Sequence, residues 1–161
     1  MRMFRFAAVL FVSAVLLAPR MEAQFSPASG FVSATTVPQS QLIQAAELVR
    51  MLKAPSAERP VVFQVGSLVM FSQAHIPNSR FAGPGSQPNG LILLQKFAAP
   101  LSKNKLIVIY CGCCPWTHCP NIGPAYQKLH DLGFTNVKVL YLANNFGDDW
   151  VAKGYPVEKG K

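Results

Sequence analysis

The chain has 161 residues, of which 50% are apolar and 14% are charged. This length suits one domain, and this share of apolar residues can supply a buried core, so an intrinsically disordered chain is excluded. The formal net charge is +8, but the Lys and Arg residues are scattered, without the basic runs and interleaved aromatic residues typical of nucleic-acid binding. We therefore predict no nucleic-acid partner and interpret the positive charge as a property of the solvated surface.

The first segment is predicted to be a targeting signal and not part of the fold. Arg2 and Arg5 precede an apolar run over residues 6–18, and a small residue, Ala23, lies near its exit. This order is typical of a secretory signal, and the apolar run is shorter than the ~20 residues that span a bilayer. We expect residues 1–23 to be cleaved after Ala23, which leaves an exported protein, periplasmic or secreted, without stable membrane insertion. An uncleaved anchor is the alternative.

The next segments predict a short linker and a helix. Residues 24–37 are small and polar, with Pro and Gly, and are interpreted as a flexible lead-in to a domain over residues 38–161. From Pro38 to Lys53 the apolar residues recur with helical spacing, beginning at Leu42, and Ser40 is a candidate cap for the helix start.

Three apolar, β-branched runs predict buried strands at residues 61–65, 105–110 and 137–142. Strands that alternate with helices favour an α/β fold with a parallel sheet covered on both faces. The remaining segments are predicted to be a short helix over 67–77, a long surface loop over 78–90, a helix over 91–99, a helix from Pro120 or Asn121 to Gly133, and a short final helix over 144–156.

All four cysteines lie in the stretch CGCCPWTHC, residues 111–119, directly after the strand at 105–110. Disulfides within such a stretch close only tiny loops, so the cluster serves a local purpose. In open α/β sheets, ligands bind at the carboxyl ends of the strands, and the start of the following helix adds partial positive charge. This setting lowers the pKa of a thiol, and it favours a thiolate on Cys111 that attacks a sulfur-bearing anion.

Two other interpretations of the cluster stay open. The four cysteines and His118 offer soft ligands for zinc or copper(I), although no second group of ligands exists elsewhere and Cys113 and Cys114 are adjacent. The C-x-x-C of residues 111–114 resembles the thioredoxin redox motif, but the chain after it is short for that fold. The alternatives are therefore a thiol–disulfide redox protein and a non-catalytic module that binds a metal or a sulfur-bearing ligand.

Three stretches together resemble the rhodanese family. FSQAHIPNSRFAG (71–83) resembles its aromatic–His–Ile–Pro signature, IVIYC (107–111) its strand and catalytic cysteine, and DWVAKGYPVEKG (149–160) its C-terminal ending. The stretches come in the family's order and spacing, and the resemblance spans about residues 38–160. The resemblance implies a five-stranded parallel sheet flanked by helices on both faces, and sulfurtransferase activity.

The resemblance also implies the roles of single residues. Cys111 is the nucleophile, which takes sulfane sulfur from a donor such as thiosulfate as a persulfide and passes it to a thiophilic acceptor. The implied partners are thus a small sulfur-containing anion and a thiol acceptor, and this chemistry uses no metal or other cofactor. Backbone amides between Gly112 and Ile122 are expected to cradle the anionic sulfur. The residues expected to contact the substrate are Gly112, Cys113, Cys114, Trp116 and His118.

The remaining cysteines have two interpretations. Cys113, Cys114 and Cys119 are candidates to resolve a persulfide on Cys111 or to form a disulfide with it. Alternatively, one pair among them stiffens the loop.

The sequence departs from the family pattern at two places. Family members usually carry Asp-x-Arg at the end of the second strand, where this chain has Gln64 and Gly66 or Ser67. The cysteine loop is longer than the common form and lacks the arginine that often holds the anionic donor, so His118 is its only titratable cation candidate. These departures argue against thiosulfate as the donor, without changing the expected fold.

A few residues outside the loop are assigned structural roles. His75 is expected to hydrogen-bond to backbone and fix its turn, and Trp150 is expected in the core. Trp116, inside the loop, is predicted to cover the site. Residues 81–90 are interpreted as a plain connector, with a rim or lid over the site as the alternative.

Overall fold

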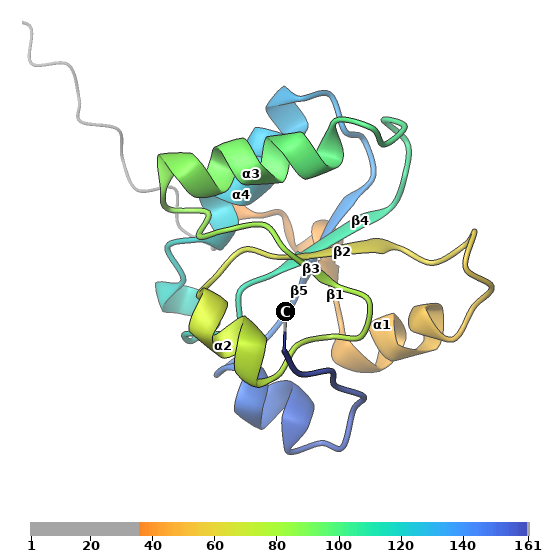
Figure 1. Ribbon diagram of the computed structural model, residues 1–161, viewed down its shortest axis with the longest axis vertical. Coiled ribbons are helices and arrows are strands. Elements are labelled where there is room, and N and C mark those ends of the chain that lie inside the picture. The colour runs from red at the N-terminus through yellow and green to blue at the C-terminus, as the bar shows by residue number, and fades with distance from the viewer. Residues whose placement is uncertain (1–35, 161) are drawn as a thin grey trace, which may run out of the picture.

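The computed structural model describes residues 36–160. The predicted signal at 1–23 and nearly all of the lead-in at 24–37 lie outside the described residues. No helix within 36–160 has both the length and the apolar character that crossing a bilayer requires. Five parallel strands form one sheet in the order β1-β5-β4-β2-β3 (Figure 1). The strands are β1 (Leu42–Ile43), β2 (Val61–Gln64), β3 (Arg80–Phe81), β4 (Ile107–Tyr110) and β5 (Val137–Leu140).

Helices cover both faces of the sheet, as expected for an α/β protein. Helices α3 and α4 pack on one face, and α1 and the single π-helical turn η4 pack on the other (Figure 1). The helical segments are η2 (Gln39–Gln41), α1 (Ala45–Leu52), α2 (Leu68–Gln73), α3 (Pro88–Ala98), η3 (Trp116–His118), α4 (Ile122–Asp131) and η4 (Gly147–Val151).

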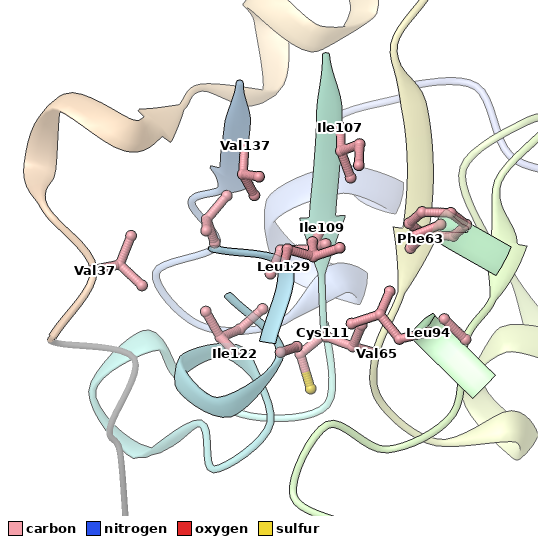
Figure 2. Close-up of a cluster of buried hydrophobic side chains, with 14 of the residues drawn as sticks. Val37, Phe63, Val65, Leu94, Ile107, Ile109, Cys111, Ile122, Leu129 and Val137 are labelled. Atoms are coloured by element: carbon pink, nitrogen blue, oxygen red, sulfur yellow. The ribbon is translucent and has the colours of Figure 1, made fainter. Parts of the chain in front are cut away.

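Strand β4 lies at the centre of the sheet, and its alternation fixes the direction of Cys111. Side chains of a strand point to opposite faces in turn. Ile107 and Ile109 belong to the core beneath α3 and α4, whereas Val108 and Tyr110 belong to the opposite core. Cys111 continues the first series, so it is directed towards the start of α4, where Figure 2 shows its sulfur near Ile122.

The predicted strands at 61–65, 105–110 and 137–142 are confirmed as β2, β4 and β5, and the helices at 67–77, 91–99 and 120–133 as α2, α3 and α4. The final helix predicted over 144–156 is limited to η4.

The predicted helix over 38–53 is wrong in its first part. Leu42 and Ile43 form an edge strand that pairs with Val139 and Leu140 of β5. The helix begins only at Ala45, so Ser40 does not cap it. The local pattern at Leu42 and Ile43 is compatible with either a helix or a short strand. Pairing with β5 makes these two residues a strand.

The predicted surface loop over 78–90 is wrong in part, although residues 82–87 form no helix or strand and residues 86–89 are exposed. Arg80 and Phe81 form β3, which pairs with the end of β2. Ala82 is fully buried, and Gly90 packs so closely on the Pro84 carbonyl that a side chain there would clash. A segment rich in Gly, Pro and Ser is usually an exposed loop. Here the absence of a side chain at Gly90 lets its backbone pack against that of Pro84. The connector interpretation of 81–90 is therefore wrong for its buried part.

Two residues with predicted structural roles behave as expected. Trp150 has no exposed surface and stacks on Phe146 at 5.8 Å between ring centroids. His75 is buried, and its Nδ1 lies 2.8 Å from the carbonyl of Phe71. The backbone of His75 also exchanges two hydrogen bonds with Glu158, which anchors the C-terminal tail to the end of α2.

Candidate functional site

The cysteine loop leaves β4 at Cys111 and is held there by Gln64, which stands where the rhodanese family usually has an acid. The Gln64 side chain donates from Nε2 to the Cys111 carbonyl at 3.1 Å, and its Oε1 accepts from the Gly66 amide at 3.1 Å. A neutral side chain thus joins the ends of β2 and β4. Because Gln64 is buried and both of its polar atoms are bonded, it costs the fold no unsatisfied group.

Gly66 makes room for Cys111. A Cβ on Gly66 would lie 2.9 Å from the Cys111 carbonyl oxygen and 3.0 Å from the Cys111 sulfur. Only glycine lets β2 end this close to the cysteine.

The four sulfur atoms gather in one place. Cys113 Sγ lies 3.0 Å from Cys111 Sγ and 3.3 Å from Cys114 Sγ. The sulfurs of Cys111, Cys114 and Cys119 lie within 4.8 Å of one another. Cys111 and Cys119 are buried, whereas Cys113 and Cys114 are half-buried. The structure therefore brings all the predicted cysteines together, and Cys113 is the thiol nearest to Cys111.

Asn121 orients this cluster, and the sequence analysis missed its role. Its Nδ2 donates to the sulfur of Cys111 at 3.3 Å and, more weakly, to that of Cys113 at 3.8 Å. Its Oδ1 accepts from both the amide and the hydroxyl of Ser86, at 3.1 and 2.8 Å. The signal in the sequence is an Asn directly before a helix, but this position usually predicts a cap. Here the side chain turns to the thiols and no cap bond forms.

The hydrogen bonds among the thiols separate their pKa values. The bond from Cys111 is the largest cause that lowers the pKa of Cys113 well below its usual range. The same bond, with burial, raises the pKa of Cys111. Burial is the first cause that raises the pKa of Cys114 to about 12. The lowered pKa expected on Cys111 falls on Cys113 instead, because Cys111 is the more buried of the two thiols.

Several backbone amides of the loop are directed to partners other than Cys111. The amides of Trp116, His118 and Cys119 donate to backbone carbonyls. Those of Asn121 and Ile122, at the start of α4, bond to the sulfur of Cys119. The helix start therefore supports Cys119, and Cys111 depends on a side-chain amide instead.

Of the other predicted loop residues, Gly112 and Trp116 pack against the domain, whereas His118 is exposed. Gly112, with a φ of +80°, turns the chain directly after Cys111 and is buried against Phe146. Trp116 is half-buried and packs on Tyr141 at 5.5 Å between ring centroids. His118 is exposed, and its Nδ1 lies 2.8 Å from the hydroxyl of Thr117. His118 is therefore not part of the sulfur cluster.

A cavity of about 110 Å³ has Cys111 in its wall. It lies between the end of β4, helix α2 and the turn η4, and none of its lining residues is charged. These residues are Gln64, Met70, Gln73, Ala74, Tyr110, Cys111, Gly112, Phe146, Gly147 and Val151. A larger cavity of about 470 Å³ lies at the opposite ends of β2 and β4, beside Val61 and Lys105, and no cysteine lines it.

Several solved structures are similar to this chain. The BH2092 protein from Bacillus halodurans is 28% identical with a TM-score of 0.57, over 74% of this chain and 77% of that chain. The rhodanese-like domain of the Alr3790 protein from Anabaena is 20% identical with a TM-score of 0.53, over 74% and 79%. A thiosulfate sulfurtransferase from Pseudomonas aeruginosa is 21% identical with a TM-score of 0.52, over 74% of this chain but 20% of that one. No protein-family model and no curated protein matches the sequence.

The strand order, the helices on both faces and these similarities define one class of fold. Residues 36–160 have the fold of rhodanese-like domains, as the resemblance in the sequence implied. Within that domain, Cys111 directly follows the central strand and starts the loop that leads to α4.

Proposed function

We propose that this protein is a sulfurtransferase that carries sulfane sulfur as a persulfide on Cys111. The observation that carries the proposal is the 3.0 Å separation of the Cys111 and Cys113 sulfurs at the carboxyl end of the central strand. The similar fold of the thiosulfate sulfurtransferase from Pseudomonas aeruginosa supports it.

The pair of sulfurs supplies both a nucleophile and a base. As the sulfur of Cys111 attacks the outer sulfur of the donor, its proton passes to the Cys113 thiolate and a new S–S bond forms. The donor's S–S bond breaks, and its electron pair leaves with the rest of the donor, which takes up the proton from Cys113. A thiophilic acceptor then attacks the outer sulfur of the persulfide and releases Cys111 as a thiolate.

The cavity beside Cys111 favours an uncharged donor. Its lining includes no Lys, Arg or His, and its walls include Met70, Phe146 and Val151. A dianion such as thiosulfate would lose its hydration there without a cation to replace it. We therefore propose an alkyl persulfide, bound in its protonated and uncharged form, as the donor class.

Mass spectrometry of the purified, reduced protein tests the proposal. After treatment with an alkyl persulfide and desalting, the intact mass should rise by about 32 Da, since the persulfide is the covalent intermediate. A thiol reductant should reverse the gain, and peptide mapping should place it on Cys111. Loading by thiosulfate at equal concentration should be slower.

Two variants control this experiment. Cys111→Ser should lose the gain, whereas Cys113→Ser should keep it but load more slowly, because only the base is removed. A mass gain that persists unchanged in Cys111→Ser would refute the assignment of the carrier.

A thiol–disulfide redox protein is the second candidate, favoured by the same short contact between Cys111 and Cys113 and by the 3.3 Å contact of Cys113 with Cys114. This function predicts reduction of insulin disulfides that requires two cysteines. A protein that accepts persulfide sulfur but does not reduce insulin would support the first candidate alone.

A further inference from the structure

The cysteine cluster lines a second, much smaller cavity. Its volume is about 10 Å³, close to the lower limit for one water-sized occupant. The sulfur-bearing residues that line it are Cys111, Cys114 and Cys119, the same three whose sulfurs lie within 4.8 Å of one another. Cys113 does not line it. Two independent features, the sulfur distances and the cavity, thus select the same three thiols.

We propose that Cys111, Cys114 and Cys119 bind one copper(I) ion in a three-coordinate thiolate site. This inference goes beyond the proposed sulfur transfer. With metal–sulfur bonds of about 2.3 Å, the sulfurs of a planar three-coordinate site lie about 4 Å apart. The three thiols therefore need only a small inward movement to hold an ion.

The donor set selects a soft monovalent ion. Thiolates favour copper(I), whereas structural zinc sites are almost always four-coordinate. His118 is exposed, and Cys113, although its sulfur lies 3.0 Å from that of Cys111, neighbours Cys114 in the chain, does not line the cavity and is not among the three sulfurs that lie within 4.8 Å of one another. Three-coordinate copper(I) matches this set.

The surroundings of the three sulfurs suit this ion as well. Asn121 Nδ2 donates to Cys111 Sγ at 3.3 Å, and the backbone at the start of α4 bonds to Cys119. Such hydrogen bonds orient ligands and offset the negative charge of the thiolates. The other walls of the small cavity are Gly112, Trp116, Ile122, Leu140 and Leu142. The side chains of these walls are apolar, which disfavours charged competitors for the thiolates.

Binding changes protonation but not the redox state. Copper enters as copper(I), each ligating thiol loses its proton to solvent, and three metal–sulfur bonds form. Affinity should therefore rise with pH. A bound ion also occupies the sulfur of Cys111, so the metal and a persulfide should exclude each other.

A competition titration tests the site. The full chain, reduced under anaerobic conditions, is titrated with copper(I) in the presence of a chromogenic copper(I) chelator. We expect one equivalent to bind, and Cys114→Ser and Cys119→Ser should each weaken binding by about 100-fold or more. Cys113→Ser and His130→Ala should change affinity less than tenfold; His130 is an exposed residue of α4 whose ring packs on Tyr126.

X-ray absorption at the copper edge gives a second readout that does not depend on how a variant folds. Three sulfur neighbours at one distance support the site. Two neighbours, a preference for zinc(II) over copper(I), or unchanged binding by Cys114→Ser would overturn it.

The persulfide assay on the same variants separates this inference from the proposed function. Cys114→Ser keeps Cys111 and its partner Cys113, so it should still gain about 32 Da from an alkyl persulfide while copper binding falls. If the unmodified chain binds no copper(I) but gains about 32 Da from the alkyl persulfide, the metal site alone is rejected. Copper binding without a mass gain would reject the sulfur transfer alone.

Discussion

Cys111 is supported by a side-chain amide and a neutral neighbour in a place where the rhodanese family usually has charged partners. Asn121 donates to its sulfur, and Gln64 holds its carbonyl. Neither contact can be recognised along the chain, because Gln64 lies 47 residues from Cys111 and Asn121 points away from the helix that it precedes. Both residues nevertheless have partners for their buried polar atoms, so the site is built without an unsatisfied group among the described residues.

Asn121→Asp should shift the reactivity of the thiols. The variant keeps an oxygen for Ser86 but loses the Nδ2 donor and adds negative charge beside the sulfurs. A hydrogen bond to a charged group contributes about 1.5–3 kcal/mol, so the lowest thiol pKa should rise by about one unit or more. The curve of alkylation rate against pH should move to higher pH. Asn136→Asp, an exposed change far from the cluster, is the control, and equal curves for the two variants would contradict the role of Asn121.

Gly66→Ala should lower the free energy of unfolding by about 1–3 kcal/mol, the usual cost of overpacking. The new Cβ would meet backbone and sulfur of Cys111, neither of which can move freely. Urea unfolding measures the change. Gly147→Ala is the matched control, since its Cβ would meet only the end of the Asn145 side chain, and it should cost clearly less.

Among the elements, β4 is central in both position and connections. Its last residue, Tyr110, is buried on the face opposite Cys111, and its hydroxyl accepts from the Ile76 amide at 3.2 Å and lies 3.3 Å from the Ser79 hydroxyl. The end of one strand thus presents the Cys111 thiol to α4 and, one residue earlier, fixes the turn that follows α2. The family signature around His75 and the cysteine strand are therefore joined physically, through the tyrosine that precedes Cys111.

The free energy of unfolding at high pH should depend on the ionisation of Tyr110. Burial raises the pKa of Tyr110 from its ordinary 10.0 to about 12. Between these values the unfolded chain loses the proton and the folded chain keeps it, so stability is full below pH 10 and falls as the pH rises towards 12. The fall due to Tyr110 should approach about 2–3 kcal/mol.

Tyr110→Phe separates this contribution from those of other groups. The variant should be less stable by about 1–3 kcal/mol at neutral pH, because the buried Ile76 amide loses its acceptor. The difference from the unmodified protein should shrink between pH 10 and 12. Tyr141→Phe, whose hydroxyl has no hydrogen bond within the described part of the chain, should run parallel to the unmodified protein. A constant difference for Tyr110→Phe would contradict the assignment.

At the scale of the whole molecule, one sheet separates two cores. One contains Cys111 and lies beneath α3 and α4, and the other contains Trp150 and lies beneath α1 and η4. Because both cores share β4 and its neighbours, we expect the domain to unfold as a single unit.

Trp150→Ala should lower the free energy of unfolding by about 3–5 kcal/mol, since Trp150 is fully buried and its indole donates to the Pro156 carbonyl at 2.9 Å. Urea unfolding followed by circular dichroism and by alkylation of the cysteines should give one midpoint, although Trp150 lies on the face opposite the thiols. Trp116→Phe, at a half-buried position in the loop, should cost less than half as much. Separate midpoints for the two probes would show that the cores unfold independently.

The sequence by itself determined the α/β class, the three long strands and the position of the cysteines directly after the central strand. These features follow from local patterns, because a run of β-branched residues prefers a strand wherever it lies. Only the tertiary structure decided that Leu42–Ile43 and Arg80–Phe81 are strands, since two residues carry too little pattern and depend on β5 and β2 for their pairing. It also decided that Cys113 is the sulfur nearest to Cys111 and that Asn121 joins Ser86 to both, because such contacts depend on which distant segments meet in space.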